Sequence, residues 1–184
     1  MNPTRWPRAG GVLPALFLAA CAATSREAPS TKPPRPVILG VMEPAAILAL
    51  GEDWAGGESS YEPLAAPVEF LASSDAAVEI EVLFGSWCGD SQEHVPHFLK
   101  ILERAESARA ARGAGPLPIH ARFIGVDREK AQPADLVAGK GIERVPTFLV
   151  YAGGREIGRV TETPVGRLEE DLAALVAEAG PAAP

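Results

Sequence analysis

The feature of this sequence that most constrains its fold is an apolar, β-branched run followed directly by a helix pattern. Residues 78–84 read Val-Glu-Ile-Glu-Val-Leu-Phe, which is typical of a buried strand, and Gly85 closes the run. The next apolar side chains fall at i, i+3, i+4 and i+7 on one helix face: Val95, Phe98, Leu99 and Leu102. A second strand pattern follows at residues 119–126. This order predicts two parallel strands joined by a right-handed crossover.

The last third of the sequence adds a short helix, a hairpin and a final amphipathic helix. They are expected at residues 133–138, 147–151 and 156–160, and from Leu168 to Val176. A Gly153-Gly154 turn separates the two strands of the hairpin, which adds antiparallel pairing to the sheet. The sequence therefore predicts an α/β fold at residues 76–180, with a mixed central sheet flanked by helices.

Residues 37–75 have a less regular pattern. We expect a short strand at 37–41 and a short helix at 43–50, with Pro44 in its first turn. Gly56 to Ser60 is expected to be a loop, and residues 67–73 a helix. We interpret this region as an N-terminal extension packed on the domain.

The N-terminus is typical of a targeting segment. Arg5 and Arg8 precede a short apolar run at residues 12–20, which ends in Leu-Ala-Ala-Cys. This ending resembles a bacterial lipobox, which implies a signal peptide at residues 1–20 and a lipid on Cys21. An ordinary cleaved secretory signal or a short uncleaved anchor are the alternatives. Removal of residues 1–20 shifts the formal charge from −7 to −9.

Residues 21–36 are rich in proline and polar side chains and predict an extended tether. The lipobox resemblance implies a lipid-anchored protein in the bacterial cell envelope, facing the periplasm. Ala22 stands where an aspartate retains many lipoproteins at the inner membrane, which favours the outer membrane by analogy. The acidic charge and the lack of a basic cluster exclude nucleic acid as an expected partner.

Three motifs resemble the thioredoxin family. Trp87-Cys88-Gly89-Asp90-Ser91 follows the first central strand and opens a helix, as the family's Trp-Cys-Gly-Pro-Cys does. Pro96 stands where that helix is commonly kinked, and Arg144 to Phe148 is similar to the loop whose cis proline faces the active-site sulfur. The resemblance covers about residues 76–178 and implies a thioredoxin-like fold. The Trp-Cys-Gly-Asp-Ser wording is similar to a bacterial subgroup that keeps a single active-site cysteine.

Cys88 is the candidate reactive residue. The chain has two cysteines, so a lipid on Cys21 leaves Cys88 as the free thiol; a Cys21–Cys88 disulfide is the competing interpretation. The unpaired N–H groups and the dipole at a helix start stabilise a thiolate, the form that attacks disulfides. The alternative is that Cys88 is a small buried apolar residue.

Ser91 limits what that thiol can do. It stands where the family has its second cysteine, and its hydroxyl is able to donate a hydrogen bond to sulfur but not to resolve a mixed disulfide. Val82 stands where thioredoxins place a buried aspartate, and Glu81 points to the opposite face by strand alternation. A mixed disulfide on Cys88 therefore needs an external thiol for its release.

No metal or cofactor is expected. One thiol and the scattered His94, His97 and His120 show no zinc-ligand spacing, and His94 is interpreted as a surface residue, with a base or metal role as the alternative. Asp90 is interpreted as a favourable charge at a helix start, although it would also repel a thiolate.

The expected function is thiol–disulfide exchange through Cys88, isomerase-like or resolved externally, with Cys88 and Ser91 as the expected catalytic residues. Substrate contacts are expected from Trp87, Gly89, Asp90, Val145 and Pro146, because a cis Pro146 would present backbone groups to an extended peptide. The expected partners are cysteine-containing envelope proteins or a small thiol, and the chain is expected to be a monomer. The alternative is a non-catalytic scaffold lipoprotein; whether the chain turns over as an oxidoreductase or isomerase stays open.

Overall fold

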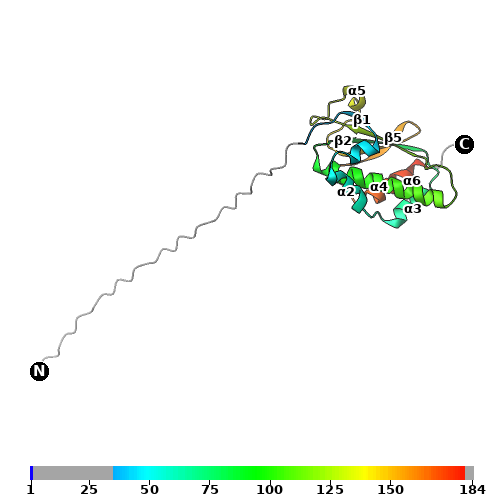
Figure 1. Cartoon of the computed structure of the whole chain (residues 1–184), viewed down its shortest axis with the longest axis horizontal. Helices are drawn as coiled ribbons and strands as arrows, with labels where there is room; N and C mark the ends of the chain where they lie inside the picture. Colours follow the sequence, from blue (N-terminus) through cyan, green and yellow to red (C-terminus); the bar gives the residue numbers. More distant parts are fainter. Residues whose placement is uncertain (2–34, 181–184) are drawn as a thin grey trace. The chain divides into compact units, whose positions relative to one another are not determined.

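A five-stranded mixed sheet forms the centre of the molecule, with strand order β1-β3-β2-β4-β5 (Figure 1). The computed structural model describes Met1 and residues 35–180. The strands are β1 (Gly40–Met42), β2 (Val78–Phe84), β3 (Ile119–Gly125), β4 (Thr147–Ala152) and β5 (Arg155–Thr161). The helices are α1 (Pro44–Leu48), α2 (Glu52–Ser60), α3 (Ala65–Ser73), α4 (Gly89–Ala111), α5 (Ala134–Val137) and α6 (Leu168–Ala179).

The sheet combines one parallel pair of strands with three antiparallel pairs. β2 and β3 are parallel, in the register Val78 to Ile119, and α4 connects them. β4 runs antiparallel to both β2 and β5, and β1 adds an antiparallel edge strand to β3. The predicted α/β class, with a mixed central sheet flanked by helices, is confirmed.

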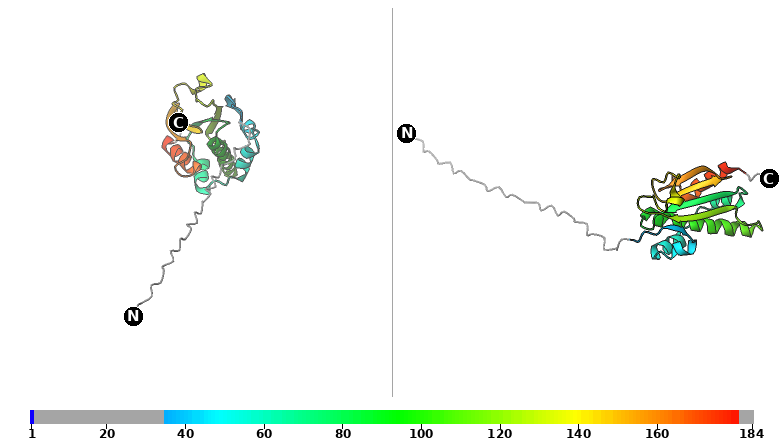
Figure 2. Two further views of the ribbon diagram at one scale, coloured as in Figure 1. Left: turned by 90° about the vertical axis from the view of Figure 1, so that its left-hand side faces the viewer. Right: turned by 90° about the horizontal axis from the view of Figure 1, so that it is seen from above.

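The sheet separates two apolar clusters of different size. Because side chains alternate along a strand, Ile80 and Val82 of β2 point into the larger cluster, under α1 to α4 and α6, while Leu83 points into the smaller one. The smaller cluster includes Val137 of α5. The left view in Figure 2 shows α4 and α6 on one face of the sheet and α5 on the other.

Residues 40–73 pack onto the same core. They form β1 and α1 to α3, and contribute buried Ile47, Trp54 and Val68 to the larger cluster. The ring of Trp54 meets Phe84 edge-on, with 5.9 Å between the centroids. The N-terminal extension is thus an integral layer of the fold.

The expected loop at residues 56–60 is wrong, because Glu52–Ser60 forms α2. The two glycines lower helix propensity, but burial of Trp54 and an ion pair between Glu58 and Lys100 of α4 hold the segment against α4. The strand expected at residues 37–41 is shorter and later, at β1.

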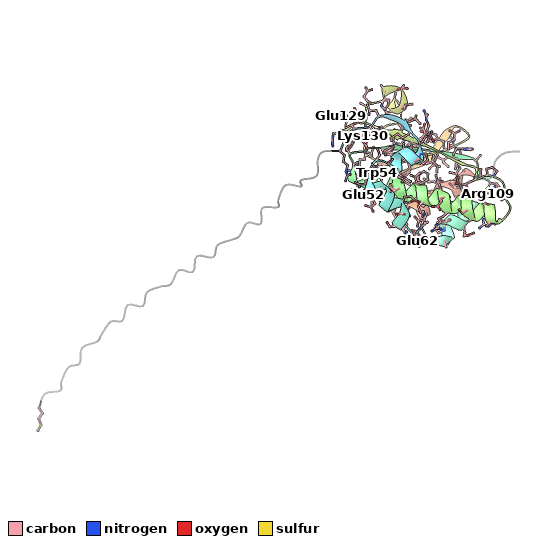
Figure 3. The ribbon with its side chains drawn as sticks, in the orientation of Figure 1. Glu52, Trp54, Glu62, Arg109, Glu129 and Lys130 are labelled. Carbon is pink, nitrogen blue, oxygen red and sulfur yellow. The ribbon has the colours of Figure 1, made fainter. Side chains whose placement is uncertain are left out.

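Arg109 ties the far end of α4 to two loops (Figure 3). Its guanidinium is buried, donates to the carbonyl oxygens of Ala72, Ser74, Gly115 and Pro116, and pairs with Asp75 at 2.8 Å. From the sequence, Arg109 was expected on a polar continuation of the helix. Its guanidinium is buried instead, because these hydrogen bonds and the ion pair with Asp75 satisfy its charge.

The signal peptide at residues 1–20, the lipidated Cys21 and nearly all of the tether lie outside the described residues. Across residues 35–180, no helix combines the length and the apolar character that a bilayer crossing requires.

Candidate active site around Cys88

Cys88 stands at the N-cap of α4, where β2 passes into the helix. Its backbone is extended, with φ −89° and ψ 133°, and its N–H donates to the carbonyl of Gly85 at 2.9 Å. The side chain is half-buried and packs against the smaller apolar cluster. The residue is therefore placed by a tight turn and is partly exposed to solvent.

Val145 and Pro146 lie beside that sulfur, 57 residues further along the chain. The Cys88 S–H donates to the carbonyl oxygen of Val145 at 3.2 Å, and the Val145–Pro146 peptide bond is cis. Both residues are buried, and the carbonyl of Pro146 accepts from the N–H of Glu162 at 2.7 Å. The structure thus brings together two motifs that the sequence paired only through a family resemblance.

Trp87 forms one wall of the site. Its indole Nε1–H donates to the carbonyl of Val126 at 3.2 Å, and the guanidinium of Arg128 lies 4.8 Å from the ring centroid. A Cβ atom on Gly85 would lie 2.7 Å from the indole, so only glycine leaves room for this ring position. Gly89 is exposed and a Cβ there would meet nothing within 4 Å, which leaves open space beside the sulfur.

Ser91 is fully buried beneath the turn. Its hydroxyl oxygen accepts from the N–H of Gly85 at 3.1 Å, and no hydrogen bond between Ser91 and the Cys88 sulfur is recorded in the described part of the chain. The Cys88 S–H has Asp90 as a further acceptor, with 3.8 Å between Oδ2 and the sulfur. Ser91 thus acts on the shape of the loop, and Asp90 supplies a second acceptor near the sulfur.

The residues behind the turn follow strand alternation. Val82 is buried in the larger cluster, whereas Glu81 lies on the other face and pairs with Lys140 and with Arg122, the latter at 3.4 Å. Within residues 35–180, Cys88 is the one free cysteine, so the described domain holds no second thiol to resolve it.

Ser86 is a residue of the site that the sequence did not single out. Its buried hydroxyl donates to the carbonyl of Pro36 at 2.6 Å and accepts from the N–H of Ile38 at 3.0 Å. A Cβ on Gly125 would lie 2.5 Å from the carbonyl oxygen of Ile38, so this part of the extension runs tightly against β3. No local pattern signals a contact across some 50 residues.

A second polar centre lies between α2, α4 and α6. The carboxylate of Glu169 is fully buried and accepts from the Tyr61 hydroxyl at 2.6 Å and from the N–H of Leu64 at 2.8 Å, and it pairs with Arg167 at 3.0 Å. Burial, then the bond to Glu169, raises the pKa of Tyr61 to about 12. The Tyr61 ring stacks on His97 at 3.8 Å between centroids.

The histidines divide into two environments. His94 and His97 on α4 are half-buried, and their ring centroids lie 6.0 Å apart; His120 on β3 is exposed. Burial, and then the nearby His94, lower the pKa of His97, which favours its neutral imidazole.

Comparisons with known proteins give only distant structural likeness. No protein-family model and no curated protein matches the chain. A Pseudomonas aeruginosa protein of unknown function is 21% identical, with a TM-score of 0.48, over 74% of this chain and 82% of that one. An HIV epitope scaffold is 20% identical, with a TM-score of 0.47, over 76% and 84%. A mutant thioredoxin from Halobacterium salinarum is 19% identical, with a TM-score of 0.38, over 61% and 83%.

Proposed function

We propose that the chain exchanges thiols and disulfides through Cys88 alone. The observation that carries this proposal is the position of the half-buried sulfur, at the first residue before α4 and 3.2 Å from the carbonyl of Val145. The unpaired N–H groups of the first helical turn favour a thiolate there, and the exposed Gly89 leaves one side open to a partner.

The exchange is a displacement at sulfur. The Cys88 thiolate attacks one sulfur of a partner disulfide, the partner's S–S bond breaks, and its second sulfur leaves as a thiolate. The product is a mixed disulfide between Cys88 and the partner. An external thiol, either a partner cysteine or a small thiol such as glutathione, then attacks this bond and releases Cys88. The external thiol supplies the electrons for any net reduction.

One observation favours a second candidate, a scaffold with an inert thiol. Both polar contacts recorded for the sulfur are to acceptors, the Val145 carbonyl and the Asp90 carboxylate, and acceptors suit an S–H group better than a thiolate. The balance between these acceptors and the helix N–H groups decides between the two candidates.

The pH dependence of iodoacetamide alkylation separates them. A reactive Cys88 is alkylated at pH 7 faster than a cysteine in an unstructured peptide, because the thiolate is the reacting form. A rate that stays low to pH 9 favours the scaffold. Trapping of mixed disulfides in non-reducing gels gives the functional readout, with Cys88→Ala as the control: partners captured by the wild type alone support exchange.

We place this activity, as part of the proposal, in the bacterial envelope. A lipid on Cys21 would anchor a monomeric domain at a membrane, facing the periplasm, where cysteine-containing proteins are oxidised. Metabolic labelling with a fatty acid tests the anchor directly. Label in the wild type and none in Cys21→Ser supports it, and equal label in both contradicts it.

A further inference from the structure

A cluster of metal-ligand side chains lies on α4, away from the thiol. Glu93, His94 and His97 each offer one ligand atom, and these three atoms all lie within 4.8 Å of one another. Cys88 does not belong to the cluster. Residues three and four apart share a helix face, so His97 meets both of the others on one side of α4.

The two imidazoles are free for a ligand. Within residues 35–180, neither His94 nor His97 forms a hydrogen bond to protein, and no buried side-chain nitrogen or oxygen lacks a partner. The unpaired ring nitrogens of the half-buried pair therefore reach solvent. Glu93 is exposed and supplies the negative charge that a cation requires.

The surroundings fix the ring of His97. Its stacking on Tyr61 sets the ring plane, and Tyr61 is itself held by its hydrogen bond to Glu169. Arg167 is the nearby cation, with its guanidinium 5.1 Å from the centre of the Tyr61 ring, but its charge is paired with Glu169. A ligand ring held in place loses less entropy when a metal binds.

We propose that Glu93, His94 and His97 form a site for a divalent first-row transition metal, with Zn²⁺ as the preferred ion. Two imidazoles and one carboxylate suit a borderline-soft cation better than Mg²⁺ or Ca²⁺, which prefer oxygen ligands. Three protein ligands leave a fourth position for water or a further ligand. The sequence led to the expectation that no metal binds, because only the histidines and the thiol were compared with zinc-ligand spacing and Glu93 was left out.

The test is Zn²⁺ titration calorimetry and Co²⁺ absorption spectroscopy on the full chain. We expect one equivalent bound, with cobalt d–d bands and no thiolate-to-cobalt charge-transfer band. His94→Ala, His97→Ala and Glu93→Gln should each weaken binding about tenfold or more. The controls are His120→Ala and Glu106→Gln, which change the same residue types outside the cluster and should bind as the wild type does.

Three results would overturn the site. The first is no saturable binding of Zn²⁺ to the wild type. The second is an unchanged affinity in both His94→Ala and His97→Ala, and the third is a loss of binding in Cys88→Ser. Circular dichroism of every variant ensures that a loss of binding is not a loss of the fold. His94→Ala is decisive here, because His94 does not stack on Tyr61 and its removal leaves that contact in place.

Discussion

The sulfur of Cys88 lies 3.2 Å from the carbonyl oxygen of Val145, although the two residues belong to different motifs of the sequence. The contact joins the start of α4 to the loop before β4. The thiol therefore has two neighbours with opposite effects. The start of α4 favours the thiolate, whereas the Val145 carbonyl, a hydrogen-bond acceptor, favours the protonated thiol.

Replacing Ser91 with cysteine should convert the single-thiol site into a dithiol. Incubation of Ser91→Cys with oxidised glutathione should give an internal disulfide, seen by mass spectrometry as the loss of two hydrogens, whereas the wild type keeps a glutathione adduct. The variant also loses an acceptor for the Gly85 N–H, at a cost of about 1 kcal/mol. A glutathione adduct that persists in Ser91→Cys would contradict this prediction. Both proteins carry Cys21→Ser, so that Cys21 does not take part in the reaction.

Gly85→Ala should displace the Trp87 ring. The added Cβ would stand 2.7 Å from the indole, so the ring must move and its hydrogen bond to Val126 must break. We expect a loss of about 1–3 kcal/mol in the free energy of unfolding and a change in tryptophan fluorescence. Urea denaturation measures the first. Gly89→Ala is the matched control, because its Cβ meets nothing within 4 Å, and an equal loss there would refute the steric argument.

Arg109→Met should destabilise the domain by roughly 2–4 kcal/mol, because it leaves carbonyl groups near α3 and the 113–116 loop without their charged donor. Thermal and urea unfolding measure this loss. Arg112→Met is the control: Arg112 is the C-cap residue of the same helix, is more exposed and, within residues 35–180, forms its ion pair with Glu69 alone. Similar losses in both variants would show that the buried hydrogen bonds of Arg109 contribute no more to the free energy of unfolding than an exposed ion pair does.

Tyr61 should titrate with a pKa of about 12. Its folded pKa lies above the value near 10 of an unfolded tyrosine, so the contribution to stability is complete below pH 10. It is lost as the pH rises from 10 to about 12. The difference in ultraviolet absorbance between the wild type and Tyr61→Phe during an alkaline titration isolates this group. A midpoint at 10 for that difference would contradict the buried bond to Glu169.

The parts of the fold that local pattern determines were predictable. β2, α4, the β4–β5 hairpin and α6 follow from apolar periodicity and from glycine turns, and their observed bounds differ from the expected ones by a few residues. α2 was missed because its two glycines give a loop signal, whereas the burial of Trp54 and the ion pair between Glu58 and Lys100 are tertiary contacts that local pattern does not show.

The candidate site was predictable in its residues but not in all of its contacts. Trp87, Cys88, Val145 and Pro146 could be named from motifs, and they lie together. The partner of Ser91 could not be named, because sequence gives no means to choose between the sulfur and the Gly85 N–H. Ser86 and the network of Arg109 depend on contacts between segments far apart in the chain.

The double hydrogen bond of Ser86 has a practical consequence for where the functional unit begins. Every motif that resembles a thioredoxin lies after residue 75, and a fragment cut at that boundary would look complete. Such a fragment would lack Pro36 and Ile38, whose backbone groups form hydrogen bonds with the hydroxyl of Ser86, two residues before Cys88. Its chemistry would then report on a loosened loop, so reactivity is best measured on protein that keeps everything from Arg35 onward.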